Sequence, residues 1–358
     1  MLAFHPLRVL TVGRIAEDAV CVTLDIPAGL RGAFAHDAGQ YVTVRRTIDE
    51  KDARRTYSIV NAPGSSEMKL GIRLQNGGRM SGDLAANLRP GDMLEVGTPM
   101  GRFRTSISAE RRHGYVAFAA GSGITPVLSL ATDILANEPR SRFTLIYGNR
   151  SIARTMFLEE TLALKNRYLD RFSVHFLMSR EPQQAAFLNG RINGAKVREL
   201  SIQLAEISGA DEYLICGPGD MVDEVRGVLQ SLNGNAQIRF ERFASAASPV
   251  EGARPLPALR TPDEVLASIS IVMDGRRRKF PMSPGDGSVL DAAERAGLEL
   301  PFSCRSGICA TCRARVVEGA AVMTHNIALA KWETDAGFIL CCQARPITAT
   351  LEVSYDQK

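Results

Sequence analysis

Four cysteines near the end of the chain constrain its fold more than any other feature. Cys304, Cys309 and Cys312 lie within the segment LPFSCRSGICATC, separated by four and then two residues, and Cys342 follows after 29 intervening residues. This is the spacing of the thiolate ligands of a plant-type [2Fe–2S] cluster. Gly307 and the small residues around it allow a loop to wrap a cluster closely and direct N–H groups at its sulfur atoms. The pattern predicts an iron–sulfur domain.

Two alternatives concern the same cysteines. A zinc ribbon usually presents two C-x2-C pairs, whereas the chain has one. Cys341 directly precedes Cys342, and neighbouring side chains of an extended segment point apart, so we expect only one of the two to bind iron. Cys342 is the expected ligand, and Cys341 is expected to be a small buried hydrophobic residue.

The composition is that of a globular protein with more than one domain. A chain of 358 residues is too long for one ordinary core, so two or three domains are expected. The net charge of +4 is small, and no basic stripe interleaves with aromatic residues. No apolar run approaches the length of a membrane span and no export signal is visible. We therefore expect a cytoplasmic protein without nucleic-acid or membrane partners.

The pattern of elements divides the chain into four parts. Residues 1–106 contain short strands separated by turns, which is typical of an antiparallel sandwich or barrel. Residues 107–245 alternate buried strands with helical patterns, which predicts an α/β domain with a parallel sheet. Residues 246–264 are rich in Ala, Ser, Pro and Gly and are expected to be a linker. Residues 265–358 form an α+β segment that holds the cysteines.

The segment RRTYSIV is a candidate flavin site. A one-electron cluster needs an electron source, and converting a hydride into single electrons requires a flavin. Arg55 offers a cation for the pyrophosphate, Tyr57 an aromatic plane and Ser58 a hydroxyl near N5 of the flavin, and Ile59 follows them. The alternative is an ordinary strand with a surface tyrosine.

The segment GGRMSGDLAANL is a second candidate flavin element. Ser81 is expected to start a helix, and a helix N-terminus with free N–H groups binds pyrophosphate. Gly78, Arg79, Met80 and Ser81 would line this site. The alternative is common turn chemistry, in which glycines precede a serine.

The segment AAGSGITP, between a buried strand and a helix, is a candidate nicotinamide-nucleotide site. Gly121, Gly123 and Pro126 form G-x-G-x-x-P, which differs from the dinucleotide fingerprint in its last position. Glycines allow the backbone to approach the pyrophosphate, and we expect Pro126 at the first position of the helix. The turn therefore predicts dinucleotide binding.

The segment YGNRS follows the second strand of the same unit, where the adenosine ribose is expected. Arg150 and Ser151 stand there with no acidic residue beside them in the sequence, which favours the 2′-phosphate of NADPH. NADH is the alternative nucleotide, and a solvated loop charge is the alternative interpretation of Arg150.

Two further segments place residues at the carboxyl ends of strands. In ICGPGDM, Cys216 and Gly217 would lie beside the nicotinamide, although Cys216 is also compatible with an ordinary buried cysteine. In RFERF, Glu241 and Phe243 stand at the end of the domain, where they could reach the flavin face.

In this order, R-x-Y-S, G-x-G-x-x-P, C-G-P and the cysteine run resemble the ferredoxin–NADP reductase superfamily fused to a [2Fe–2S] domain. Within it, GSGITPVLS, SRFTLIYGNRS, FERF and CQARP are similar to the reductase subunits of phenylacetyl-CoA epoxidases. The resemblance implies an FAD-binding six-stranded antiparallel barrel, an α/β NAD(P)-binding domain and a β-grasp-type ferredoxin domain. It also implies electron transfer to a di-iron oxygenase of phenylacetate breakdown.

The resemblance also implies the roles of single residues. Arg55 would bind an FAD phosphate, Tyr57 would stack on the ring and Ser58 would bond N5, with Gly78 to Ser81 at the pyrophosphate. Gly121, Gly123 and Thr125 would hold the NADP phosphates. Catalytic roles fall to Ser58, Cys216 and Glu241, with Phe243 beside the ring junction. Iron would be bound by Cys304, Cys309, Cys312 and Cys342, although Cys341 replaces a more usual serine.

Three other functions stay open. The chain could be the reductase of another oxygenase, such as a steroid or aromatic-ring hydroxylase. It could be a redox sensor that switches partners with its cluster, or a zinc-stabilised interaction module. The basic segment DGRRRKF, residues 274–280, could dock an acidic partner or be a solvated turn.

Overall fold

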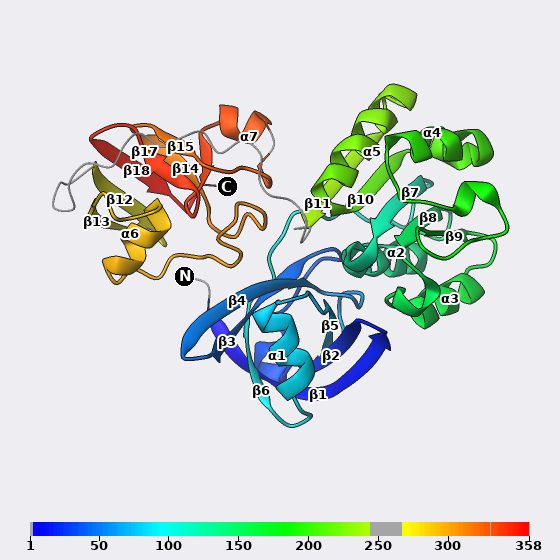
Figure 1. The fold of residues 1–358 in the computed structure, drawn as a ribbon, viewed down its shortest axis with the longest axis horizontal. Helices are drawn as coiled ribbons and strands as arrows, with labels where there is room; N and C mark the ends of the chain where they lie inside the picture. Colours follow the sequence, from blue (N-terminus) through cyan, green and yellow to red (C-terminus); the bar gives the residue numbers. More distant parts are fainter. Residues whose placement is uncertain (1–2, 244–266, 330, 358) are drawn as a thin grey trace. The chain divides into compact units, whose positions relative to one another are not determined.

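The structure is a computed structural model that describes residues 3–243, 267–329 and 331–357 (Figure 1). It forms two compact units, one spanning Phe4–Ala246 and one containing Ala247–Lys358. The linker expected at residues 246–264 lies outside the described residues. No helix in the described ranges has the length and apolar character needed to cross a membrane.

The first sheet is an antiparallel barrel, as expected. Its strands follow the order β4-β3-β6-β1-β2-β5. A bridge between Ile59 and Leu70 joins the end of β4 to β5 and so connects the two edges. Helix α1 (Arg79–Asn87) contributes Met80 and Leu84 to the apolar core. The strands are β1 (Phe4–Ala16), β2 (Ala19–Asp25), β3 (Tyr41–Ile48), β4 (Lys51–Ser58), β5 (Glu67–Arg73) and β6 (Met93–Gly97).

Strand β4 begins earlier than the sequence pattern suggests. Asp49 and Glu50 both have positive φ, 49° and 59°, and Ile48 pairs with Lys51 across them. Two left-handed residues between paired strands make the tight hairpin turn that matches the twist of a sheet. This turn lacks the usual Asn-Gly or Asp-Gly signal.

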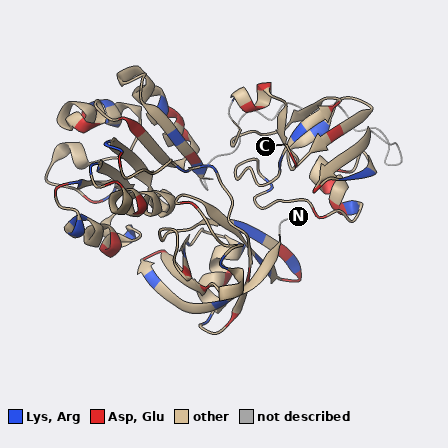
Figure 2. Ribbon diagram, turned by 180° about the vertical axis from the view of Figure 1, so that it is seen from behind, with Lys and Arg blue, Asp and Glu red and all other residues tan. Residues whose placement is uncertain are grey.

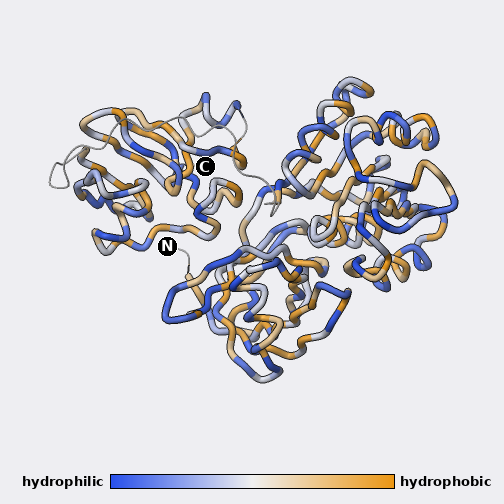
Figure 3. Tube along the Cα trace, viewed as in Figure 1, coloured by the Kyte–Doolittle hydropathy of each residue, from blue (hydrophilic) through white to orange (hydrophobic). Residues whose placement is uncertain are grey.

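The second sheet is parallel and confirms the α/β prediction. Its order is β11-β10-β7-β8-β9. Tyr115, Ala117 and Ala119 of β7 pack toward α2 and α3, whereas Val116 and Phe118 pack toward α4 and α5. Figure 3 shows hydrophobic and hydrophilic stretches alternating along this part of the chain. The elements are β7 (Gly114–Ala120), α2 (Ile124–Asn137), β8 (Arg142–Asn149), α3 (Leu158–Arg167), β9 (Phe172–Met178), α4 (Gly194–Gln203), β10 (Glu212–Pro218), α5 (Gly219–Leu232) and β11 (Gln237–Phe243).

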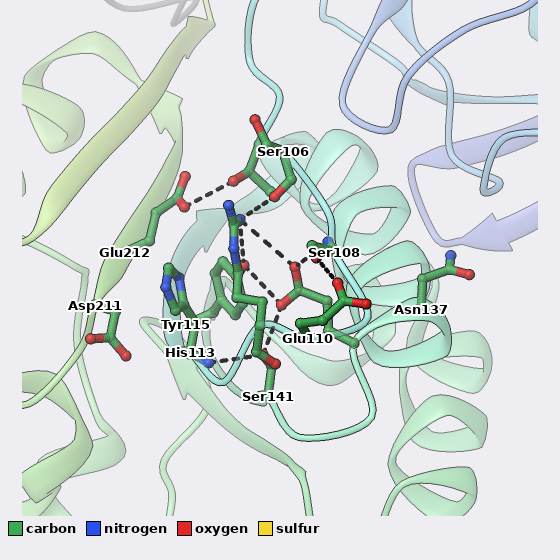
Figure 4. A network of polar contacts seen from close by, with 12 residues as sticks. Ser106, Ser108, Glu110, His113, Tyr115, Asn137, Ser141, Asp211 and Glu212 are labelled. Carbon is green, nitrogen blue, oxygen red and sulfur yellow. Dashed lines mark hydrogen bonds and ion pairs between the residues drawn. The ribbon is translucent and has the colours of Figure 1, made fainter.

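A buried polar network fastens the connection between these two sheets (Figure 4). The fully buried Glu138 accepts hydrogen bonds from the Tyr115 hydroxyl at 3.0 Å and the Ser141 hydroxyl at 2.7 Å. It also accepts the Ser108 N–H at 3.1 Å. Because these residues lie where the parallel strands begin, the opposite, carboxyl edge is left for ligands.

The second unit is a small α+β fold. Its main sheet has the order β13-β12-β18-β14-β16, in which β12 and β18 are parallel. Helix α6 packs its buried residues into the apolar core of this unit. Together with the two sheets above, this unit confirms the predicted multi-domain fold class. The elements are β12 (Ala267–Met273), β13 (Arg276–Met282), α6 (Val289–Arg295), β14 (Arg313–Glu318), β15 (Ala321–Met323), α7 (Lys331–Asp335), β16 (Phe338–Leu340), β17 (Ala344–Pro346) and β18 (Thr350–Ser354).

Candidate functional site

The four candidate cluster cysteines come together as two pairs. The thiols of Cys304 and Cys309 interact by a hydrogen bond, and so do those of Cys312 and Cys342. Within the described residues, no three His, Cys, Asp or Glu side chains converge as a single bound ion requires. Two pairs suit two iron atoms that each take two thiolates, whereas structural zinc takes four ligands around one ion.

Backbone donors surround the first cysteine of the run. The N–H groups of Ser306, Ile308 and Cys309 point at Cys304 Sγ from 3.4, 3.5 and 3.4 Å. The Cys309 thiol and these donors lower the pKa of Cys304 against the opposing effect of burial. A thiolate is therefore favoured at this position, which is the form that binds metal.

Gly307 and Gln343 hold the loop in place. Gly307 has φ +73°, and a Cβ atom there would lie 2.9 Å from the His325 carbonyl oxygen. Gln343 Nε2 donates to the Arg305 carbonyl at 2.9 Å and to Cys342 Sγ at 3.7 Å. Gln343 was not among the residues expected from the sequence, although it directly follows the last cysteine of the run.

Cys341 lies in the apolar core instead. Its side chain is fully buried, and burial raises the pKa of its thiol to about 12. Its N–H donates to the Cys312 carbonyl at 3.0 Å. The thiol that pairs with Cys312 belongs to Cys342.

The candidate flavin strand is the end of β4. Arg55 is exposed, Tyr57 is half-buried against the barrel core and Ser58 is buried. The Arg55 guanidinium donates to the Arg54 carbonyl at 2.7 Å. Ile59 is fully buried, so only its backbone is available to a ligand. The segment thus presents a cation, an aromatic ring and a hydroxyl within four residues.

Helix α1 differs from the expectation in its starting point. Gly78 is its N-cap and Arg79 its first residue, so Ser81 does not start the helix. Ser81 is turned back, and its hydroxyl accepts the Gln75 N–H at 3.1 Å. The Met80 side chain belongs to the barrel core. The helix start has no capping side chain, which leaves its first N–H groups to other partners.

The Arg79 side chain reaches the β3–β4 hairpin. Its guanidinium donates to the Ile48 carbonyl at 2.6 Å and to Asp49 at 3.3 Å. The Arg79 side chain therefore connects the first turn of α1 to the β3–β4 hairpin.

The G-x-G turn approaches β10 closely. Gly121 has φ +56°. A Cβ atom on Gly123 would lie 2.2 Å from the Cys216 carbonyl oxygen, so only glycine fits there. Helix α2 begins at Ile124, directly after a 3-10 turn at Gly121–Gly123. Pro126 is therefore the third residue of the helix and not the first, because the helix begins two residues earlier than expected, directly after this turn.

Thr125 faces the barrel. Its side chain is buried, and its hydroxyl donates to the Ser122 carbonyl at 2.9 Å. Its methyl group lies 2.7 Å from where a Cβ on Gly71 of β5 would stand. Only its backbone is thus available to phosphates.

Positive charge gathers after β8. Arg150 is exposed and Ser151 half-buried. Partial burial, Arg154 and Arg180 all lower the pKa of Arg150, which places three guanidinium groups in one neighbourhood. Arg180 comes from the loop after β9 and was missed in the sequence because tertiary structure brings it close.

An acidic residue from another segment also lies at this turn. Glu181 accepts the Ile152 N–H at 2.8 Å through its carboxylate. It comes from the segment after the neighbouring strand, so sequence proximity did not reveal it. Its carboxylate is engaged by the backbone.

Cys216 and Glu241 lie side by side on β10 and β11. They occupy paired positions of parallel strands, and Cys216 Sγ lies 4.0 Å from a Glu241 carboxylate oxygen. Burial raises the pKa of Glu241 to about 8. Phe243 is half-buried opposite Pro218, and Gly217 is buried between these positions.

An ion cluster connects the barrel with the parallel sheet. Asp18, in the turn between β1 and β2, accepts two hydrogen bonds from Arg73 Nη1, both at 2.9 Å. Arg154 of the nucleotide half donates to the same carboxylate at 3.0 Å. The sequence carried no signal for this contact. Elsewhere, charges of both signs are interspersed on the strands and helices (Figure 2).

The fold and these sites define an oxidoreductase that carries flavin, nucleotide and iron–sulfur domains in one chain. Residues 6–105 match the family described as oxidoreductase FAD-binding domain. Residues 118–227 match oxidoreductase NAD-binding domain, and residues 271–346 match 2Fe-2S iron-sulfur cluster binding domain.

Curated relatives cover the whole chain. It is 36% identical to one of the subunits of the 1,2-phenylacetyl-CoA epoxidase of Escherichia coli, over 100% of this chain and 99% of that one. It is 30% identical to the ferredoxin reductase component of 3-ketosteroid-9-alpha-monooxygenase of Rhodococcus rhodochrous, over 97% and 96%. The chain therefore belongs to the ferredoxin–NADP reductase family, in the branch with a C-terminal ferredoxin domain.

Solved structures share the fold. Phthalate dioxygenase reductase aligns over 98% of each chain with a TM-score of 0.57 at 22% identity. A ferredoxin NADP+ reductase of Neisseria gonorrhoeae aligns over 67% of this chain and 98% of its own, with a TM-score of 0.57 at 20% identity. These likenesses confirm the predicted architecture.

Proposed function

We propose that this chain is the NADPH-dependent reductase of a multicomponent di-iron oxygenase, most specifically of a phenylacetyl-CoA epoxidase. The observation that carries the proposal is the full-length similarity to one component of such an epoxidase, together with all three cofactor domains. When bound, FAD accepts a two-electron hydride and a [2Fe–2S] cluster carries electrons singly, which connects a nucleotide donor with a metal-containing acceptor.

On this proposal the barrel holds the flavin. Arg55 and the uncapped start of α1 bind its phosphates, because both offer positive charge or free N–H groups at the surface. Tyr57 covers a ring face, and the Ser58 hydroxyl donates near N5. Burial raises the pKa of the Tyr57 hydroxyl, so this ring stays uncharged in the neutral range.

The parallel sheet holds the nucleotide. The turn at Gly121 and Gly123 binds the pyrophosphate at its backbone, and Arg150 with Ser151 binds the 2′-phosphate. Cys216 and Glu241 border the nicotinamide at the carboxyl ends of β10 and β11. The buried thiol of Cys216 and the half-buried, largely protonated carboxyl of Glu241 would border the ring junction with little charge.

The second unit holds the cluster. Cys304, Cys309, Cys312 and Cys342 would hold the cluster through their thiolates, which lie as two pairs. The N–H groups around Cys304 and the Gln343 amide stabilise negative charge on the sulfur atoms.

Reconstitution with separate oxygenase components tests the proposal. The holoprotein should support NADPH- and O2-dependent conversion of phenylacetyl-CoA when mixed with the oxygenase component of a phenylacetyl-CoA epoxidase. The oxygenase component of a 3-ketosteroid-9-alpha-monooxygenase serves as the matched alternative. Faster turnover with the steroid system would contradict the epoxidase assignment, and repeated NADPH-driven reduction of ferricyanide would argue against a sensor.

A further inference from the structure

The side-chain amide of Asn149 is buried without a partner at the carboxyl edge of the parallel sheet. Asn149 is the last residue of β8, directly before Arg150, and 8% of it is exposed. Across the described residues, neither its Nδ2 nor its Oδ1 atom has a hydrogen-bond partner. A buried amide without a partner destabilises a fold, and such groups in folded proteins call for an explanation such as a ligand or water.

The amide lies beside the nucleotide turn. Tyr147 precedes it by two residues in the same strand, so both side chains share one face of β8. That hydroxyl donates to the carbonyl oxygens of Gly121 and Met156, at 3.1 Å each. Gly121 is the first glycine of the G-x-G turn, so Asn149 is near the expected pyrophosphate position.

A second donor without a partner lies at the same turn. The Arg73 guanidinium of β5 stands 3.8 to 3.9 Å from where a Cβ on Gly121 would be. Its Nη1 binds Asp18 and its Nη2 binds the Arg154 carbonyl. Its Nε–H is buried and finds no acceptor in the described part of the chain.

The chemistry of these groups selects the ligand. Arg73 Nε and Asn149 Nδ2 are both donors, and pyrophosphate oxygens only accept. Arg150, Arg154 and Arg180 add positive charge nearby. An anionic acceptor group therefore suits each of these donors.

We propose that Asn149 is a nucleotide-binding residue whose Nδ2 donates to the pyrophosphate of the bound nicotinamide nucleotide. It stands between the turn at Gly121 and the Arg150 site, and so connects recognition of the pyrophosphate with recognition of the 2′-phosphate. The inference rests on the proposed function, because it assumes a nucleotide in this site.

Binding to the oxidised holoprotein tests the inference, with NADP+, adenosine 2′,5′-bisphosphate and adenosine 2′-monophosphate as probes. Asn149→Ala should bind the first two about tenfold more weakly, as expected for one lost hydrogen bond to a charged group. Its affinity for adenosine 2′-monophosphate, which lacks the 5′-phosphate, should be unchanged. Asn149→Asp should bind NADP+ at least as weakly as the alanine variant, because a carboxylate repels phosphate.

Stability separates this role from a structural one. Without nucleotide, Asn149→Ala should lose only the packing of the removed atoms and no hydrogen bond, so it should melt higher than the control variant below, and NADP+ should raise its melting temperature less. Asn233→Ala is the matched control at the amino edge. It loses bonds to the Ala210 and Ser208 carbonyls, at 2.9 and 3.3 Å, so it should melt lower while keeping its NADP+ affinity.

Four results would overturn the inference. If Asn149→Ala bound NADP+ as tightly as the wild type, the Asn149 amide would bind a buried water molecule and not the nucleotide. An equal loss for adenosine 2′-monophosphate would assign it to the ribose or 2′-phosphate. Full binding by Asn149→Asp would exclude the donor role, and a fall in the melting temperature of nucleotide-free Asn149→Ala as large as that of Asn233→Ala would show a structural partner. If the wild type bound neither NADP+ nor NAD+, the proposed function itself would fail.

Discussion

Cys216 Sγ lies 4.0 Å from Glu241 Oε2, between neighbouring parallel strands at the carboxyl edge of the sheet. Burial raises the pKa of Glu241 to about 8 and the pKa of Cys216 well above its usual value. The nearby carboxylate further raises the pKa of the thiol. Both groups are therefore mainly protonated in the neutral range, and the pair carries little charge.

Glu241→Gln should change how stability depends on pH. The folded pKa of Glu241 is about 8 against an ordinary value of 4.5, so the folded state holds this proton longer than the unfolded state. The wild type should lose stability as pH rises from 4.5 toward 8, and the variant should not show this part of the loss. One pKa unit corresponds to about 1.4 kcal/mol, so near pH 8 the variant should be more stable by up to about 4–5 kcal/mol.

Urea unfolding of both proteins at several pH values measures this difference. The two curves should converge near pH 4.5, where the wild-type carboxyl is protonated in the folded state and about half protonated in the unfolded state. A constant offset at every pH would instead indicate lost packing and contradict the raised pKa.

Replacing each of two neighbouring cysteines should have opposite consequences. Cys342→Ala should lose the cluster, because the thiol paired with Cys312 disappears. Cys341→Ala should keep the cluster and its visible absorbance, at a cost of about 1 kcal/mol for the lost core contacts. Iron content and the absorbance spectrum measure the outcome, and cluster loss in Cys341→Ala alone would reverse the ligand assignment.

Arg150→Ala should lower the preference for NADPH. Loss of a charged contact to the 2′-phosphate should reduce kcat/KM for NADPH by about 10- to 100-fold and leave the value for NADH nearly unchanged. Steady-state reduction of ferricyanide with each nucleotide measures this. Arg167→Ala, an exposed arginine in the last turn of α3, is the matched control. An equal effect on both nucleotides would refute the 2′-phosphate role.

Two glycine-to-alanine changes should differ in sign. In Gly123→Ala the new Cβ would stand 2.2 Å from the Cys216 carbonyl oxygen, so the turn must move, and both stability and nucleotide binding should fall. In Gly227→Ala, inside α5, no atom lies within 4 Å of the new Cβ. That variant should gain about 0.5–1 kcal/mol of stability from helix propensity.

Thermal unfolding and NADP+ titration of both glycine variants give the answer. Normal nucleotide affinity in Gly123→Ala would mean that the close approach to β10 is not needed for the site. If Gly227→Ala were less stable than the wild type, the new methyl group would have to clash with a neighbour, contrary to the open space at this position.

Much of the fold followed from local patterns. Alternating and continuous apolar runs identified strands of the barrel and of the parallel sheet, because the burial of one or both faces of a strand appears directly in the order of its residues. The cysteine spacing indicated the iron–sulfur domain for a similar reason, since one short loop supplies three of the four ligands. Less visible were local backbone conformations, such as the Asp49–Glu50 turn and the early start of α2, where neighbouring structure overrides residue preference.

The amino-acid order by itself determined the elements, their succession and the local ligand motifs, because these depend on residues close together in the chain. The tertiary structure alone decided which distant groups meet. It brought Arg180 and Glu181 to the Arg150 site, joined Asp18 to Arg154 and placed Glu241 beside Cys216. It also buried the Asn149 amide without a partner. Such contacts depend on how strands pair and how the barrel packs on the parallel sheet, and residue order does not encode those distances locally.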